Sequence, residues 1–482
     1  MTDLLAEVPT QLLIGGKWVD ALHRATMPVD DPATGDVLCQ VADAGPEDGR
    51  LAVAAAVEAQ PDWARTAPRA RSEILRRGYE IVLSRTDELA ALMTAEMGKP
   101  LAEARGEVAY AAEFLRWFSE EAVRIDGGYG TLPDGRNRML LMRQPVGPCL
   151  LVTPWNFPLA MGARKIGPAI AAGCTMVLKP APQTPLSSLA LAAILSEAGL
   201  PPGVLNVVTT SRAGEVVEPM LRGGAIRKLS FTGSTQVGRL LLAQCADQVV
   251  RASMELGGNA PFVVFDDADI EAAVAGAMVA KMRNMGEACT AANRFFVHRS
   301  VADEFAARLA ERMAALTVGP GTRAGVDVGP LIDGAGRAKV ESLVADATAR
   351  GARVLVVGTA PDGPGYFYPP TVLTDVAADS DLLATEIFGP VAAILTFDDE
   401  DEVLRAANAT EWGLVGYVYT RDLDRAMRVS ERLEVGMVGL NTGLVSNPAA
   451  PFGGIKHSGL GREGGRVGID EFLEYKYVAI PY

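Results

Sequence analysis

Cys289 stands in a setting that the other cysteines of the chain do not share. It lies in NMGEACTAANRF, a segment rich in small residues that follows an alanine-rich helix, expected to be capped near Asp269, and leads into the strand RFFVH. Such a loop leaves a thiol accessible, and a thiolate is a strong nucleophile once positive potential or a base favours its ionisation. The remaining cysteines have apolar neighbours and are interpreted as small buried side chains: Cys39, Cys149, Cys174 and Cys245.

Two polar side chains are suited to assist a cysteine nucleophile. Glu255 in MELGGNAPF follows a short strand and precedes two glycines, where a sharp turn can expose its carboxylate as a base. On spacing alone, a capping or solvated role explains Glu255 equally well. Asn156 in PWNFP follows the strand CLLVT, and strand ends of this kind line the ligand crevice of an open α/β sheet. Its amide can serve an oxyanion, although asparagine in such loops is more often a turn former.

Candidate dinucleotide contacts lie at two other strand ends. FTGSTQVG offers Gly233 for close backbone approach and a helix N-terminus near Ser234 for a pyrophosphate. Lys179 in LKPAP can reach ribose hydroxyls or a phosphate, or it is an ordinary exposed lysine. Because the GxGxxG spacing is missing, these features do not assign a cofactor by themselves.

Composition excludes several classes of protein. The chain has 482 residues, of which 49% are hydrophobic and 22% charged, so two or three globular lobes are expected. No apolar run is long enough to cross a bilayer, and the N-terminus, with Asp3 and Glu7, does not resemble a secretory signal, so a cytoplasmic protein is expected. A net charge of −14 argues against nucleic-acid binding. Five scattered cysteines without a CxxC pair, and three isolated histidines, predict neither disulfides nor a metal site.

The order of predicted elements indicates an α/β protein. Residues 46–124 are typical of successive helices with breaks near Pro68, Thr86 and Pro100, and strands alternate with helices from Pro148 and again from Pro261. Extended stretches at 125–144 and 471–482 lie outside both series and can pair with a second subunit. We therefore expect a cofactor-binding domain at 1–124 and 145–252, a catalytic domain at 253–440, and an oligomerisation arm with a C-terminal segment at 125–144 and 441–482.

Seven motifs together resemble the aldehyde dehydrogenase superfamily in order and approximate spacing: PWNFP, KPAPQTP, FTGST, MELGGNAPF, GEAC, EIFGP and PFGGIKHSGLGRE. The resemblance covers nearly the whole chain. It implies a Rossmann-type cofactor domain, an α/β catalytic domain, a small β oligomerisation arm, and a homodimer or homotetramer. It makes Cys289 the nucleophile, Asn156 and the Cys289 N–H the oxyanion donors, and Glu255 the base that hydrolyses a thioester. It also assigns NAD(P) contacts to nine positions: Thr153, Pro154, Trp155, Lys179, Pro182, Gly233, Ser234, Glu386 and Phe388.

Within the superfamily the closest resemblance is to succinate-semialdehyde dehydrogenases. Arg164, Arg283 and Ser446 occupy the three positions that bind the substrate carboxylate in those enzymes, and guanidinium groups suit a carboxylate because they form paired hydrogen bonds and stay charged. Without the resemblance, both arginines are better read as helix-surface residues in ion pairs. Glutarate semialdehyde differs from succinate semialdehyde by one methylene, so the sequence does not separate these substrates.

Three positions depart from patterns common in the family. Glu287 replaces a glutamine and adds a carboxyl near the thiol. Pro182 replaces a glutamate of many NAD-preferring relatives, which makes NADP acceptable. Ala291 stands where some relatives have a second cysteine, so no redox switch is expected. Alternatives left open are a broad-specificity or CoA-acylating dehydrogenase and, in a different class, a cofactor-free cysteine hydrolase.

Overall fold

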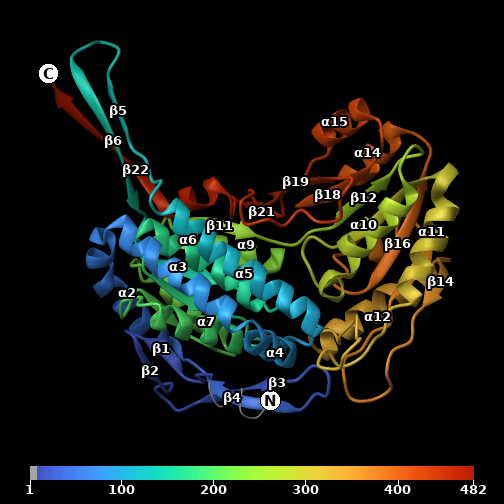
Figure 1. Cartoon of the computed structure of the whole chain (residues 1–482), viewed down its shortest axis with the longest axis horizontal. Coiled ribbons are helices and arrows are strands. Elements are labelled where there is room, and N and C mark those ends of the chain that lie inside the picture. Colours follow the sequence, from blue (N-terminus) through green and yellow to red (C-terminus); the bar gives the residue numbers. More distant parts are fainter. Residues whose placement is uncertain (1–7) are drawn as a thin grey trace.

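The computed structural model describes residues 8–482, so the predicted start of the first domain and the acidic residues Asp3 and Glu7 lie outside the described residues. Two lobes, each built on its own sheet, lie side by side, and a narrow arm projects from one of them (Figure 1). Within residues 8–482, no helix is both long and apolar enough to span a bilayer.

The first lobe contains an eight-stranded sheet in the order β2-β1-β9-β8-β7-β10-β11-β21. The five strands from β9 to β11 in this order are parallel, and β1, β2 and β21 pair antiparallel at the edges. The strands are β1 (Leu12–Ile14), β2 (Lys17–Val19), β7 (Cys149–Val152), β8 (Met176–Lys179), β9 (Leu205–Val207), β10 (Lys228–Thr232), β11 (Arg251–Glu255) and β21 (Gly459–Leu460). The predicted domain boundary at 253 therefore falls inside β11, which belongs to this sheet.

Helices cover both faces of the first sheet because successive strand residues point to opposite sides. Leu151 of β7 packs into a core with α3 to α7, whereas Leu150 packs into a second core with α8 and α9. The breaks predicted at Pro68, Thr86 and Pro100 are confirmed as the starts of α3, α4 and α5 or the residue before. The helices are α2 (Pro46–Arg65), α3 (Pro68–Ser84), α4 (Thr86–Met97), α5 (Leu101–Glu121), α6 (Pro158–Ala172), α7 (Leu186–Glu197), α8 (Ala213–Arg222) and α9 (Thr235–Ala246).

The second lobe contains a seven-stranded sheet in the order β14-β15-β16-β13-β12-β18-β19, in which only β14 and β15 pair antiparallel. Its strands are β12 (Ala260–Val264), β13 (Ala292–His298), β14 (Arg353–Val357), β15 (Thr371–Thr374), β16 (Val391–Phe397), β18 (Val415–Tyr419) and β19 (Met437–Leu440). Its helices are α10 (Ile270–Met282), α11 (Arg299–Ala314), α12 (Gly334–Ala349), α13 (Asp381–Ala384), α14 (Glu400–Asn408) and α15 (Leu423–Arg432). Asp269 caps α10 as predicted, since its side chain accepts from the Ala272 N–H.

The arm is a three-stranded antiparallel sheet of β5 (Gly128–Thr131), β6 (Asn137–Pro145) and β22 (Leu473–Pro481). Figure 1 shows it extending away from the first lobe with the C-terminus near its tip. The two extended stretches expected from the sequence therefore pair with each other. Two smaller pairs complete the fold: β3 (Thr26–Asp30) with β4 (Val37–Ala42), and β17 (Trp412–Gly413) with β20 (Ile455–Lys456).

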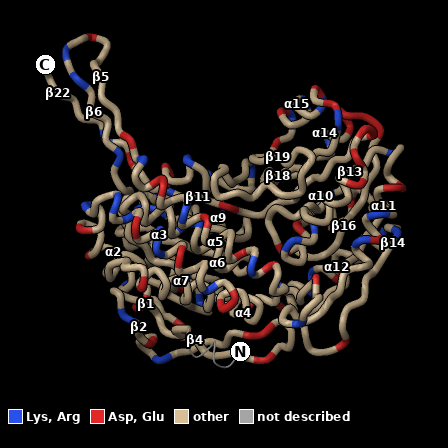
Figure 2. The backbone as a smooth tube through the Cα atoms, in the orientation of Figure 1, with Lys and Arg blue, Asp and Glu red and all other residues tan. Residues whose placement is uncertain are grey.

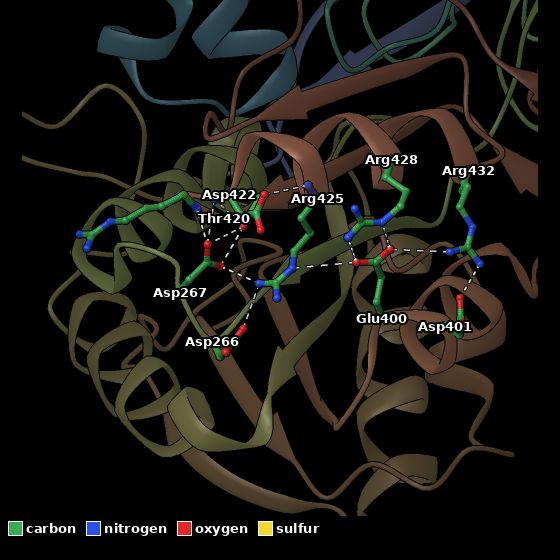
Figure 3. Close-up of polar contacts among 10 residues, drawn as sticks. Asp266, Asp267, Glu400, Asp401, Thr420, Asp422, Arg425, Arg428 and Arg432 are labelled. Carbon is green, nitrogen blue, oxygen red and sulfur yellow. Dashed lines mark hydrogen bonds and ion pairs between the residues drawn. The ribbon is translucent and has the colours of Figure 1, made fainter.

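Basic and acidic residues lie close together along α14 and α15 (Figure 2), and a network of ion pairs joins α15 to α14 and to the turn after β12 (Figure 3). Arg425 contacts Asp266 at 3.0 Å and Asp267 at 2.9 Å, and Arg428 contacts Glu400 at 2.7 Å. Burial tends to raise the pKa of Asp267, but hydrogen bonds from Thr420 and the backbone after it, together with the charge of Arg425, lower it overall. The hydrogen bond from Arg428 lowers the pKa of Glu400.

We expect Arg425→Met to lower the stability at neutral pH by about 1 kcal/mol, because the methionine keeps the packing but removes a cation shared by carboxylates. Carboxylates with lowered folded-state pKa values stabilise the fold above their ordinary values of 3.8 and 4.5, and lose that contribution as the pH falls below them. The difference in melting temperature between variant and wild type should therefore shrink in acid. Arg353→Met, which removes an exposed pair with Asp375, is the control. Equal melting temperatures for Arg425→Met and wild type at pH 7 would contradict the prediction.

Candidate active site

Cys289 lies between α10 and β13, where the chain leaves the helix through a tight turn. Asn284 and Met285 both have φ of 55° and Gly286 has φ of 80°, a left-handed run that ends the helix. The thiol lies in a cavity of about 300 Å³ between the two lobes. Burial raises its pKa to about 12, Arg164 and Arg283 oppose this shift, and Glu386 and Glu255 add to it. The thiol is thus protonated at rest and needs help to ionise.

Asn156 reaches the same cavity from the first sheet. It follows β7, and Pro158 begins α6 two residues later. Its side-chain amide donates to the backbone carbonyl of Glu287 at 3.0 Å. The backbone carbonyl of Asn156 accepts from Lys99 Nζ at 2.8 Å, and Lys99 forms a buried ion pair with Glu107. The Asn156 amide is thus oriented by one hydrogen bond on a backbone held by Lys99, which preorganises it to act on a nearby charge.

Glu255 is the last residue of β11 and is 2% exposed. Within residues 8–482, neither carboxyl oxygen of Glu255 has a hydrogen-bond partner. Burial is the largest cause that raises its pKa well above the usual range, Glu463 adds to it, and Arg164 and Lys165 oppose it. Glu255 is not one of the cavity-lining residues, but its charge acts on the Cys289 thiol. A buried carboxyl without a fixed partner can exchange a proton with a small ligand.

The predicted carboxylate-binding residues share the cavity with Cys289 but differ in their partners. Arg283 donates to Ser446 Oγ at 3.3 Å, and its guanidinium lies 4.9 Å from the centre of the Phe157 ring and 5.6 Å from that of Tyr110. Arg164 is 2% exposed and forms an ion pair with Glu463 at 2.8 Å. Arg164 therefore already has a carboxylate partner, which it shares with Lys165, whereas Arg283 forms no ion pair within residues 8–482.

The predicted cofactor contacts fall into two groups. Six line the cavity: Pro154, Trp155, Gly233, Ser234, Glu386 and Phe388. Ser234 caps α9 by accepting from the Val237 N–H, which leaves the N-terminus of a twelve-residue helix at the cavity. A Cβ added at Gly257 would come within 3.0 Å of Glu386 Oε2, so only a glycine keeps that carboxylate uncovered. These donors and acceptors fit a dinucleotide.

The other three predicted contacts lie outside the cavity-lining set. Thr153 directly follows β7, Lys179 ends the adjacent strand β8, and Pro182 is partly exposed in the turn that follows. Burial lowers the pKa of Lys179 to about 8. These residues lie at the carboxyl ends of parallel strands, where the ligand crevice of such a sheet forms. Their expected contacts with the cofactor stay predictions.

The Glu287 side chain turns toward the loop before α12. Its Oε1 accepts from the Ile332 N–H at 3.1 Å and its side chain is almost fully buried. Burial raises its pKa well above the usual range, with Lys99 and Lys339 opposing and Asp333 adding to the shift. The Glu287 carboxyl, two residues before Cys289, therefore contacts the loop before α12, and its burial shifts it toward the neutral form.

Several cavity-lining residues are not among those predicted from the sequence. Phe157, Gly257 and Phe452 lie inside motifs already noted, and their place in those motifs is the only signal. Tyr110 from α5 and Lys339 from α12 carry no local signal, because only the packing of distant helices brings them to the cavity.

Comparison with known proteins agrees with this geometry. Residues 18–478 match the model of the aldehyde dehydrogenase family. A succinate-semialdehyde dehydrogenase of Paenarthrobacter nicotinovorans is 58% identical over 92% of this chain and 100% of its own length. A glutarate-semialdehyde dehydrogenase of Pseudomonas aeruginosa is 51% identical over 98% of this chain and 97% of its own.

A solved structure described as an NADP-dependent enzyme of E. coli is 49% identical, covers 100% of this chain and 99% of that chain, and superposes with a TM-score of 0.97. The predicted α/β fold with an aldehyde dehydrogenase-like arrangement is therefore confirmed. The chain belongs to the aldehyde dehydrogenase family, whose members oxidise aldehydes with NAD or NADP.

Proposed function

We propose that this enzyme oxidises succinate semialdehyde, or a close ω-carboxy aldehyde, to the dicarboxylic acid. The observation that carries the proposal is the Arg283 guanidinium, which forms no ion pair within residues 8–482 and lies beside Ser446 in the cavity of Cys289. A half-buried guanidinium packed beside aromatic rings can bind a carboxylate through paired, charge-assisted hydrogen bonds. Because the chain has a net charge of −14, such a group provides local positive potential that attracts an anionic substrate.

The same geometry supports covalent catalysis by Cys289. Its thiol gives its proton to water, the thiolate attacks the aldehyde carbon, and the new C–S bond leaves an oxyanion that the Cys289 N–H and the second N–H of the Asn156 amide stabilise. A bound NAD(P), held by cavity-lining residues such as Trp155, Ser234 and Glu386, would supply the acceptor for the hydride of this carbon. Glu255 then takes a proton from water, the resulting hydroxide attacks the thioester carbonyl, and the C–S bond breaks to release the acid.

Arg164 is assigned a lesser part in substrate binding. Its pairing with Glu463 supports a role in shaping the cavity and in lowering the thiol pKa. Glutarate semialdehyde stays the main alternative substrate, since one methylene changes binding by only about 1 kcal/mol in a forgiving pocket. Pro182 supports acceptance of NADP, because no carboxylate at that position repels a 2′-phosphate.

The experiment compares succinate semialdehyde with butanal, an uncharged aldehyde of the same carbon count, for wild type and Arg283→Ala, following reduction of NAD and of NADP. We expect kcat/KM for the semialdehyde to fall at least about 100-fold in the variant, equivalent to about 3 kcal/mol of a charge-assisted contact. The value for butanal should change little. Equal losses on both aldehydes would remove the carboxylate assignment, and ester hydrolysis without nicotinamide reduction would favour the cysteine hydrolase.

We also propose that the enzyme forms a homodimer or homotetramer through its arm. Tyr129, Tyr475 and Tyr482 on the arm are 68%, 61% and 69% exposed, and β5 is an edge strand. Exposed aromatic side chains beside an unpaired edge favour burial against another subunit. Light scattering of the purified chain tests this assignment, and a monomer at micromolar concentration would exclude it.

A further inference from the structure

Asn284 is a buried asparagine that the mechanism above does not use. It lies five residues before Cys289, is fully buried, and adopts a left-handed conformation with φ of 55°. Its backbone N–H donates to Glu103 Oε2 at 2.7 Å, and its carbonyl accepts from the Glu287 N–H at 2.8 Å. A non-glycine residue in this conformation costs about 1 kcal/mol or more, so its surroundings must hold it there.

The side chain of Asn284 joins the two catalytic loops. Its Nδ2 donates to the carbonyl of Asn156 at 3.0 Å and to the carbonyl of Glu287 at 3.0 Å. The Asn156 amide donates to that same Glu287 carbonyl at 3.0 Å. These bonds close a ring of three hydrogen bonds between the loop after β7 and the loop before β13, which belong to different sheets.

Only an asparagine meets the requirements of this position. One NH₂ group supplies both hydrogens, and the flipped amide would place Oδ1 against two carbonyl oxygens, so the network sets its orientation. Within residues 8–482, Asn284 Oδ1 has no partner, in agreement with an orientation chosen by the donors. Asparagine also tolerates the left-handed backbone better than most side chains.

We infer that Asn284 is a positioning residue whose amide sets the separation between the Asn156 amide and the Cys289 backbone N–H. This inference rests on the proposed function, in which these two groups bind the oxyanion. The two donors belong to separate lobes. The ring of hydrogen bonds fixes the position of one donor relative to the other, and it includes Glu287, which lies two residues before Cys289. Asn284 itself faces a neighbouring cavity of about 310 Å³ that it lines with Arg283 and Glu103.

Asn284→Gly is the sharpest test, because glycine keeps the left-handed turn and removes only the amide. We expect kcat for the aldehyde to fall about 100-fold with a much smaller change in KM, since a misplaced oxyanion donor acts on the transition state. The rate at which iodoacetamide alkylates Cys289 should stay near the wild-type rate, because alkylation forms no oxyanion. Disorder of the loop would instead alter both KM and alkylation, and that result would overturn the inference.

Asn284→Asp covers the case in which the glycine variant folds poorly. Aspartate keeps the size and tolerates the turn, but an ionised carboxylate cannot donate to either carbonyl, so the same loss of kcat is expected. Asn206→Gly is the matched control. Asn206 is also fully buried, and its Nδ2 bridges the carbonyls of Met176 and Gly203 at 3.2 and 2.9 Å, but it lies on β9. Its loss should lower the melting temperature and leave kcat within a few-fold of wild type.

Asn156→Ala and the Asn156→Ala/Asn284→Gly double variant separate this inference from the proposed function. Because Asn284 acts through Asn156, the double variant should be no slower than Asn156→Ala alone. An unchanged kcat in Asn156→Ala would overturn the oxyanion assignment in the proposed function. A large loss in Asn156→Ala with wild-type kcat in both Asn284 variants would overturn the inference about Asn284 alone, as would fully additive losses in the double variant.

Discussion

A Cys289→Ala variant is expected to lose aldehyde oxidation by at least about 10⁴-fold, because no other group can form the covalent intermediate. Cys289 is the thiol of the cavity and lies among the residues that would hold the aldehyde. The loss should be equal for succinate semialdehyde and butanal, which distinguishes it from the substrate-dependent loss in Arg283→Ala. Cys39→Ala is the control, since this partly exposed thiol on β4 lies outside the cavity. Normal turnover by Cys289→Ala would refute the nucleophile assignment.

The pH dependence of the same thiol gives a second readout of its environment. Burial raises the pKa of Cys289 to about 12, so in the cofactor-free enzyme the thiolate fraction should rise about tenfold for each pH unit between pH 7 and 9. Alkylation by iodoacetamide, followed by mass spectrometry of the Cys289 peptide, should follow this slope. A plateau below pH 8 would mean that the two arginines outweigh burial and that the thiol is ionised at rest.

Glu255→Gln should turn the enzyme into one that completes its first half-reaction and then stalls. Glutamine cannot take a proton from water, so the thioester on Cys289 should accumulate after one equivalent of reduced cofactor, and steady turnover should fall about 10²- to 10⁴-fold. Rapid mixing measures the burst, and intact-protein mass spectrometry measures the acyl adduct. The Cys289→Ala/Glu255→Gln double variant should show neither signal.

The pH dependence of thioester hydrolysis in the wild-type enzyme also tests whether Glu255 acts as a base. Burial and Glu463 raise the pKa of Glu255 above its ordinary 4.5, so at low pH its carboxyl holds a proton and cannot act as a base. Thioester hydrolysis should therefore increase as the pH rises through the raised pKa, and this limb should vanish in Glu255→Gln. A variant that shows no burst and a proportionate loss of both half-reactions would indicate a structural role for Glu255 instead.

The local elements of the fold could be predicted because their signals are local. Proline breaks and helical spacing located α3, α4 and α5, and short β-rich runs located the central strands of both sheets. The sequence alone does not assign β11 to one sheet, because Arg251–Glu255 follows one series and precedes the other, and its pairing with β10 places it in the first sheet. Sequence periodicity cannot show which neighbour a strand will choose.

The sequence by itself determined which groups are available for the reaction: a cysteine in a small-residue loop, a glutamate before two glycines, and an asparagine after a strand. It also contains motifs that resemble one family. Tertiary structure alone decided how these groups act. It paired Arg164 with Glu463, left Arg283 without an ion pair within residues 8–482, turned Glu287 toward Ile332, and joined Asn284 to Asn156 across two lobes. The physical reason is that charge balance, desolvation and hydrogen-bond partners depend on residues distant in the chain, which become neighbours only when both sheets have packed.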